Sequence, residues 1–98
     1  MNNEIIHELE LESTFCDVVL SGQKPFEILI NDRGFQKGDH IKFIPMRGSL
    51  PIVHDIAKAM FEITYVLNGH GLKEDYVCIA IKKCEPITRD LIDYELKL

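Results

Sequence analysis

Residues 22–39 contain the side chains of this chain that are best suited to chemistry. Lys24 and Glu27 are three positions apart, and Arg33 and Phe35 follow shortly after them. A lysine and a carboxylate in one cleft can hold and polarise a ligand, and the carboxylate can act as a general base or accept protons from a base edge. A guanidinium fork suits a phosphate or a guanine edge, and an aromatic ring can stack on a base. The segment is therefore a candidate site for RNA or a nucleotide-like ligand, with Lys24 and Glu27 as candidate catalytic groups.

Each of these residues also has an ordinary structural interpretation. Lys24 and Glu27 could form a salt bridge across a turn, worth at most about 1 kcal/mol. Arg33 could be an exposed turn residue. For Phe35 we favour a core position that anchors its loop.

The residues that separate these groups are typical of turns. Asn31 and Asp32 open the segment Asn-Asp-Arg-Gly, and we expect both to hydrogen-bond nearby backbone. Lys37 precedes Gly38 in a second turn. The complete candidate ligand-binding set is Lys24, Glu27, Asn31, Arg33, Phe35 and Lys37.

The histidines and cysteines do not have the spacing of a metal site. The four histidines are scattered and the three cysteines include no Cys-x-x-Cys pair, so we expect no metal, no cofactor and no disulfide. His54 and Asp55 are a weak acid/base alternative. Cys16 lies among apolar residues and is a poor nucleophile candidate.

The segment after Gly22 resembles the signature of the ASCH domain superfamily, Gly-x-Lys-x-x-Glu-x-Arg. Gly22, Lys24 and Glu27 match it, and Leu29 stands where the family has arginine. A longer series, Lys-x-Phe-Glu-Ile, Asn-Asp-Arg-x-Phe, Gly-Asp and Gly-Leu-Lys-Glu-Asp-Tyr-Val, resembles a narrower branch of short bacterial and phage proteins known only as a domain of unknown function. The resemblance covers residues 5–82. It implies a PUA-like β-barrel and suggests RNA or nucleotide binding beside Lys24 and Glu27.

Two alternative functions stay open. One branch of the ASCH superfamily hydrolyses the acetyl amide of acetylated cytidine, with a lysine at the position of Lys24 and a threonine at that of Glu27. A small amidohydrolase acting on a modified nucleoside is therefore one alternative, although this chain has a carboxylate in place of the hydroxyl. The other is a phage-related protein-interaction domain with a protein partner.

Composition predicts a single domain over residues 1–98. The chain is 46% hydrophobic and 28% charged, and its net charge of −5 disfavours non-specific coating of nucleic acid. The charge is uneven, because residues 1–23 carry five acids and no Lys or Arg, whereas residues 24–58 carry six bases and four acids. Without a long apolar run or a leader pattern, we expect a cytoplasmic protein that does not contact membranes.

Hydrophobic patterning predicts an α+β fold that is mainly β, a small PUA-like β-barrel with one or two short helices. Residues 7–12 alternate as a strand with His7, Leu9 and Leu11 inward. Ser13 is the expected N-cap of a short helix that ends at Gly22, with an apolar face of Phe15, Val18 and Val19.

Further strands are expected at residues 26–30, 40–44, 59–67 and 76–81, with a long loop at 45–55. In the strand at 26–30 the apolar face should be buried and Glu27 should point the other way. Residues 92–98 alternate as a final strand, with a short helix as the alternative. The expected core contains Phe26, Ile28, Phe61, Ile63, Val77 and Ile79.

Overall fold

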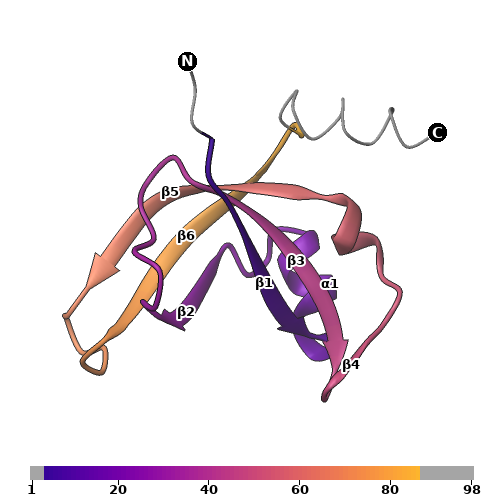
Figure 1. The fold of residues 1–98 in the computed structure, drawn as a ribbon, viewed down its shortest axis with the longest axis horizontal. Helices are drawn as coiled ribbons and strands as arrows, with labels where there is room; N and C mark the ends of the chain where they lie inside the picture. Colours follow the sequence, from indigo (N-terminus) through magenta and orange to yellow (C-terminus); the bar gives the residue numbers. More distant parts are fainter. Residues whose placement is uncertain (1–3, 87–98) are drawn as a thin grey trace.

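The computed structural model describes residues 4–86, which form a curved β-sheet with one α-helix against it (Figure 1). The prediction for residues 92–98 lies outside the described residues. The elements are β1 (Ile6–Glu12), α1 (Ser13–Leu20), β2 (Phe26–Ile30), β3 (His40–Arg47), β4 (Leu50–Pro51), the 3₁₀ helix η1 (Asp55–Lys58), β5 (Met60–Asn68) and β6 (Tyr76–Cys84). No helix within residues 4–86 is long and apolar enough to span a membrane.

The strands follow the order β1-β3-β5-β6-β2, and β4 pairs with the end of β3. β1 runs parallel to β3, whereas the other pairs are antiparallel. Figure 1 shows that the sheet bends so that its two edge strands, β1 and β2, lie on either side of an opening. The mainly β, α+β class is confirmed, and the sheet is not closed into a barrel within the described residues.

β1 has the predicted amphipathic pattern. His7, Leu9 and Leu11 are buried, and the glutamates between them are exposed. The two leucines pack in the main hydrophobic cluster of the core, which consists of Leu9, Leu11, Cys16, Val19, Phe35, Ile41, Phe43, Ile56, Phe61, Ile63, Val77, Ile79 and Ile81. The predicted core positions on β5 and β6 are therefore confirmed.

The helix is present, but its predicted N-cap is wrong and its predicted apolar face is right only in part, because Val19 is buried and Phe15 is not. Glu12 is the N-cap and makes no side-chain capping bond, and Ser13 is already helical. Cys16 and Val19 are buried, whereas Phe15 is exposed. Cys16 and Val19 are one turn apart, so a narrow apolar stripe is enough to pack so short a helix against the core. Gly22 has φ +85°, the left-handed conformation predicted for it.

β2 has the predicted bounds, but its buried face is the opposite of the predicted one. Phe26, Ile28 and Ile30 are 39%, 52% and 53% exposed, whereas Glu27 is only 8% exposed. Phe26 and Ile28 are thus not core residues. Leu29, on the inner face, packs against the core cluster. The rule that a carboxylate faces water fails here because Glu27 has a cationic partner inside the fold.

Part of the expected loop at residues 45–55 is strand. β3 continues through Pro45 to Arg47, and β4 folds back on it. Ile52 N–H donates to the Pro45 carbonyl at 2.9 Å, so the proline contributes an acceptor although it has no donor. The loop prediction is therefore wrong for residues 45–47 and 50–51, which are strand, and right for residues 52–54, which belong to no helix or strand. Pro45 is tolerated because it lies near the end of a strand, where a missing donor costs little.

β5 and β6 form the long antiparallel pair at the centre of the sheet. β6 is a central strand, as predicted, and is paired with β2 on one edge and with β5 on the other. Its Val77, Ile79 and Ile81 are buried, whereas the apolar residues between them are only partly buried. A bulge between Ile63 and Tyr65 shifts the β5 register. Tyr65 is therefore exposed although it alternates with the buried Ile63.

Candidate functional site

Lys24 and Glu27 are in direct contact. Lys24 Nζ donates to Glu27 Oε2 at 2.6 Å, and the two side chains are 23% and 10% exposed. Two backbone hydrogen bonds position Lys24 for this contact. Gly22 N–H donates to the Val19 carbonyl, and Lys24 N–H donates to the Val18 carbonyl. The chain thus turns sharply out of α1 and delivers the ammonium to the first inward position of β2.

Two aromatic rings flank the ammonium. Lys24 Nζ lies 4.5 Å from the ring centroid of Phe15 on α1 and 5.4 Å from that of Phe26 on β2. Both rings are partly exposed. A cation over an aromatic face gains about 0.5–1 kcal/mol at exposed sites and more when it is desolvated. The arrangement offers stacking surface, a cation and a carboxylate beside one another.

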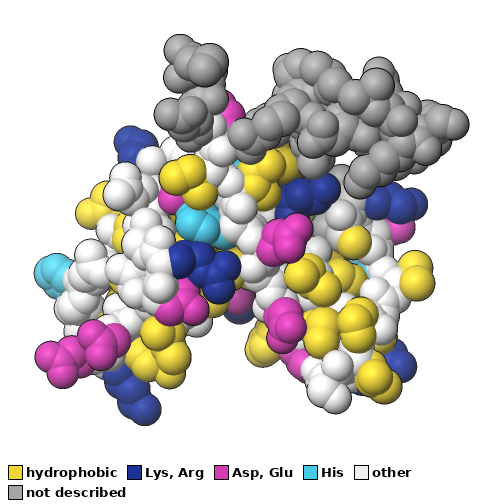
Figure 2. Space-filling view, in the orientation of Figure 1, with side chains coloured by type: hydrophobic (Ala, Val, Ile, Leu, Met, Phe, Trp, Pro, Cys, Tyr) yellow, Lys and Arg dark blue, Asp and Glu magenta, His cyan; other side chains and the backbone are white. Residues whose placement is uncertain are grey.

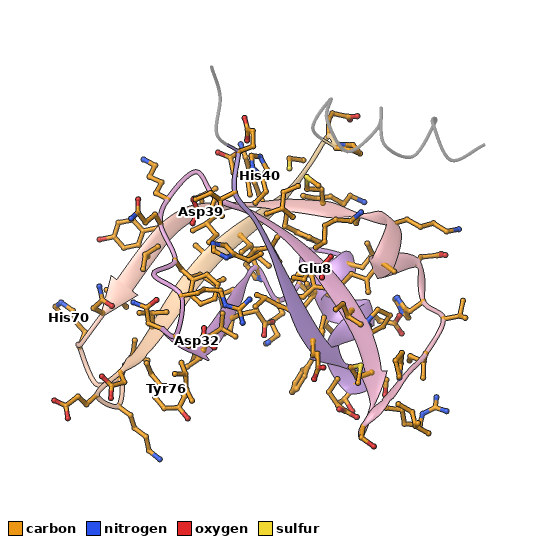
Figure 3. The ribbon with its side chains drawn as sticks, in the orientation of Figure 1. Glu8, Asp32, Asp39, His40, His70 and Tyr76 are labelled. Atoms are coloured by element: carbon orange, nitrogen blue, oxygen red, sulfur yellow. The ribbon has the colours of Figure 1, made fainter. Side chains whose placement is uncertain are left out.

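Arg33 lies beyond the other end of β2 and connects the loop at residues 31–39 to β1. Its Nη1 donates to the Glu8 carbonyl at 3.1 Å, and its Nε donates to Asp32 Oδ1 at 2.9 Å. That hydrogen bond lowers the pKa of Asp32 below its ordinary value. Figure 3 shows Asp32 and Glu8 on the two sides of the opening between β2 and β1. Arg33 therefore joins these two sides through its side chain.

Phe35 is buried at 4% exposure, in the core position that we favoured for it. The Arg33 guanidinium lies 5.5 Å from its ring centroid, and the His7 ring meets it edge to face at 4.7 Å. Asn31 Oδ1 accepts from Phe35 N–H at 3.0 Å, as expected for a turn asparagine. Asn31 and Phe35 thus hold the loop in place.

A His7–Asp39 pair was not anticipated from the sequence. His7 Nε2 lies 2.8 Å from Asp39 Oδ2, which also accepts from Gln36 N–H at 3.1 Å. The sequence does contain one sign of such a pair, because His7 lies on the otherwise apolar inward face of its strand. A buried polar ring needs a hydrogen-bond partner. The pair fastens the loop to β1 from the inside.

A surface groove of about 520 Å³ is lined by Ile6, His7, Glu8, Arg33 and Lys42. Lys24 and Glu27 are not part of its lining. Five residues separate Glu27 from Arg33 in the sequence, and β2 ends at Ile30, after which Asp32 N–H donates back to the Ile30 carbonyl at 2.9 Å in a tight turn. The structure therefore brings Lys24 and Glu27 together and places Arg33 in a second location, while Lys37 is exposed in the loop at residues 31–39.

The side chains of the remaining candidates are engaged in structural contacts. His54 Nδ1 accepts from Ile56 N–H at 3.0 Å, so Nε2 carries the proton that bonds Asp17 Oδ1 at 2.7 Å. Cys16 is buried, and burial raises the pKa of its thiol. Within residues 4–86, no three His, Cys, Asp or Glu side chains are grouped as metal ligands.

The face of the molecule seen in Figure 2 is hollowed between the half that carries β2 and the half that carries α1.

A search of curated proteins finds no match to this chain. A family model described as a domain of unknown function (DUF3850) matches residues 6–81, which include every residue of the candidate set. The chain therefore belongs to the DUF3850 family of domains of unknown function.

Proposed function

We propose that this domain is related to the ASCH superfamily and its PUA-like folds, and that it binds RNA or a nucleotide-like ligand beside Lys24 and Glu27. The order of motif residues supports the relationship, because Gly22, Lys24 and Glu27 meet at a single turn. The strongly bent sheet is compatible with a barrel-derived architecture.

The observation that carries the binding proposal is the position of the Lys24 ammonium, between two partly exposed rings and on a buried carboxylate. A base stacked on Phe15 or Phe26 would gain about 1–3 kcal/mol. Its edge would then lie near Glu27, which uses one of roughly four lone-pair sites for Lys24. A carboxylate there accepts from the amino or imino N–H groups of a base edge.

The groove at Arg33 is a second candidate location for the ligand. Arg33 and Lys42 line it with two cations suited to phosphate, and neither Lys24 nor Glu27 is part of its lining. A ligand that uses both locations would be a short single strand, whereas a mononucleotide would use the Lys24 turn alone.

The test is a titration of fluorescently labelled single-stranded RNA with the wild type, Lys24→Ala and Phe15→Ala. Both substitutions should weaken binding about tenfold or more, the second because a stacking ring is lost. Lys73→Ala, which removes an exposed lysine from the β5–β6 turn, is the matched control and should bind as the wild type does. Equal affinity for all four proteins would reject the site.

The amidohydrolase alternative makes a different prediction. Amide hydrolysis needs an activated nucleophile and a group that stabilises the oxyanion. Lys24 could serve the oxyanion, but Ser21, the hydroxyl closest in sequence, donates to the Val18 carbonyl at 3.3 Å. We expect no efficient release of cytidine from acetylated cytidine, as followed by chromatography. Rapid release that is lost in Glu27→Gln would instead establish Glu27 as a base that activates water.

A protein-interaction role has one specific observation in its favour. The outward residues of β2 are apolar and exposed, and in the sheet register they lie beside Tyr76, Cys78 and Ala80 of β6, where a sheet usually presents polar side chains.

A further inference from the structure

The Glu27 carboxylate has one oxygen that no group of the described chain uses. Oε2 accepts from Lys24 Nζ at 2.6 Å, whereas no donor within residues 4–86 binds Oε1. The Glu27 side chain is only 10% exposed, and an unpartnered oxygen on so buried a side chain requires an explanation. Among the described residues, Glu27 has no fully buried oxygen that lacks a hydrogen bond. Oε1 is therefore accessible from the surface and open to a ligand.

The Lys24 ammonium lies beside this carboxylate and also has donors to spare. An ammonium has three N–H donors, and Glu27 uses one of them. The Lys24 side chain is 23% exposed, and the partly exposed rings of Phe15 and Phe26 flank its Nζ. A ligand that binds here meets a donor group next to two acceptor oxygens.

The two rings do not select one base over another. Every nucleobase has a π-face, so stacking on Phe15 or Phe26 adds affinity whatever the sequence. Selection has to come from hydrogen bonds at the edge of the base. A carboxylate only accepts hydrogen bonds and an ammonium only donates them. The pair of Lys24 and Glu27 therefore fits an edge that has two adjacent donors followed by an acceptor.

We propose that the base recognised at this site is guanine, an inference that rests on the proposed binding of a nucleotide beside Lys24 and Glu27. Among the four RNA bases, guanine is the one with two adjacent donors, N1–H and the N2 amino group, next to an acceptor, O6. The two donors pair with the Glu27 carboxylate in the bidentate manner of a guanidinium. O6 accepts from Lys24 Nζ, so all three positions of the edge are matched.

The other three bases present an acceptor where Glu27 requires a donor. Adenine has one donor, the N6 amino group, beside the N1 acceptor, and cytosine has its N4 amino group beside the N3 acceptor. Uracil has a single donor, N3–H, between two carbonyl oxygens. Each of these edges turns a lone pair toward the carboxylate, and this repulsion adds to the preference for guanine.

Charge distinguishes guanine from an arginine side chain, which also has paired N–H donors. A guanidinium can stack on an aromatic ring and bind a carboxylate in the same way. It would, however, bring a cation against the Lys24 ammonium, which is 2.6 Å from Glu27 Oε2. Guanine is uncharged and offers O6 to that ammonium. The site therefore favours the base over an arginine-containing peptide.

The preference for guanine can fail while the binding proposal stands. RNA binding that depends on Phe15 and Lys24 but has the same affinity for every base would leave the ligand site in place and remove only the preference. Equal affinity of the wild type, Lys24→Ala and Phe15→Ala would remove both.

Competition by nucleoside monophosphates tests the preference on the unmodified protein. GMP should displace a labelled single-stranded RNA at a concentration at least about tenfold lower than IMP does, because inosine lacks the N2 amino group and forms one fewer hydrogen bond to a charged acceptor. AMP, CMP and UMP should compete no better than IMP. Calorimetric titration of GMP and IMP makes the same comparison without RNA. Equal affinities for GMP and IMP, a preference for another base, or no binding of GMP would overturn the inference.

Two glutamate variants show whether Glu27 reads the base. The measured quantity is the ratio of dissociation constants for an oligonucleotide with one inosine and for the same oligonucleotide with guanosine at that position. In Glu27→Gln the ratio should fall from at least about tenfold toward one, because the amide replaces an acceptor with a donor. Glu74→Gln, at an exposed glutamate in the β5–β6 turn, is the matched control and should keep the ratio of the wild type. A purely structural Glu27 would weaken both ligands equally, and an unchanged ratio in Glu27→Gln would overturn the inference.

Discussion

The Glu27 carboxylate is nearly buried, and the Lys24 ammonium is the cation that pairs with it. Removing the partner of a buried charge typically costs more than the pair itself contributes, since the remaining charge stays desolvated. The same contact that makes the site chemically interesting therefore makes it structurally necessary.

This dependence predicts a characteristic mutant cycle. Lys24→Met keeps the apolar stem, removes the charge, and should lower the free energy of unfolding by roughly 1–3 kcal/mol. Lys24→Met combined with Glu27→Leu should recover most of that loss, because no unpaired charge remains. Urea unfolding measures both. Lys58→Met, at an exposed pair with Asp55, is the control and should change stability by less than about 0.5 kcal/mol.

Arg33 and Asp32 offer a second test at the scale of a residue. Because the guanidinium stabilises the ionised carboxylate, the pKa of Asp32 lies below its ordinary value in the folded state. The contribution to stability is therefore complete above that ordinary value and is lost as pH falls through the folded-state pKa. In Arg33→Ala the NMR titration midpoint of the Asp32 carboxyl should rise. Arg47→Ala should leave it unchanged, and an unchanged midpoint in Arg33→Ala would show that the contact does not form in solution.

At the scale of an element, β2 presents alternating backbone environments along its five residues. The amides of Glu27 and Leu29 face β6, and those of Phe26, Ile28 and Ile30 face the unpaired edge. In dilute protein, hydrogen exchange should be slow at the first pair and fast at the other three. Val77 and Ile79 on β6, which is paired on both sides, should exchange slowly as a control. Uniform protection of β2 in dilute protein would mean that its edge is already covered.

β2 also shows how far the sequence could predict this fold. Its bounds and its period follow from the residues, because Pro25 and the turn at Asn31 delimit an apolar run. Its orientation does not follow, since a single glutamate decided the expected face and the Lys24 contact reversed it. A pattern reports the spacing of polar groups and not whether an ion pair will allow one of them to be buried.

The candidate site was predictable to a similar degree. The proximity of Lys24 and Glu27 followed from motif spacing, and the core position of Phe35 followed from its apolar character. The pairing of His7 with Asp39 did not, because these residues are far apart in the sequence and meet only through the parallel β1–β3 pairing. Contacts fixed by non-local strand order leave little trace in a single sequence.

At the scale of the whole molecule, charge limits how nucleic acid can bind. The acidic residues of β1 lie on one side of the opening, and few cations lie close to the proposed ligand surface. Two to four phosphate contacts should give a slope of log affinity against log salt of roughly −1.5 to −3 for a single strand. Titrations at several salt concentrations measure it. A slope near zero would exclude phosphate contacts, and one much steeper would indicate binding outside this surface.

The strand order has a consequence for how the chain folds during synthesis. β2 is made early, yet its only partner in the described structure is β6, and Phe26 pairs with Ala80. The β5–β6 hairpin is the most local long pairing, so it is the natural first structure, and β2 adds to it afterwards. Until β6 leaves the ribosome, both edges and the apolar side chains of β2 are unprotected in the nascent chain. Aggregation during translation should therefore depend on how quickly residues 76–84 follow, and slowing synthesis between β2 and β6 should reduce the yield of folded protein.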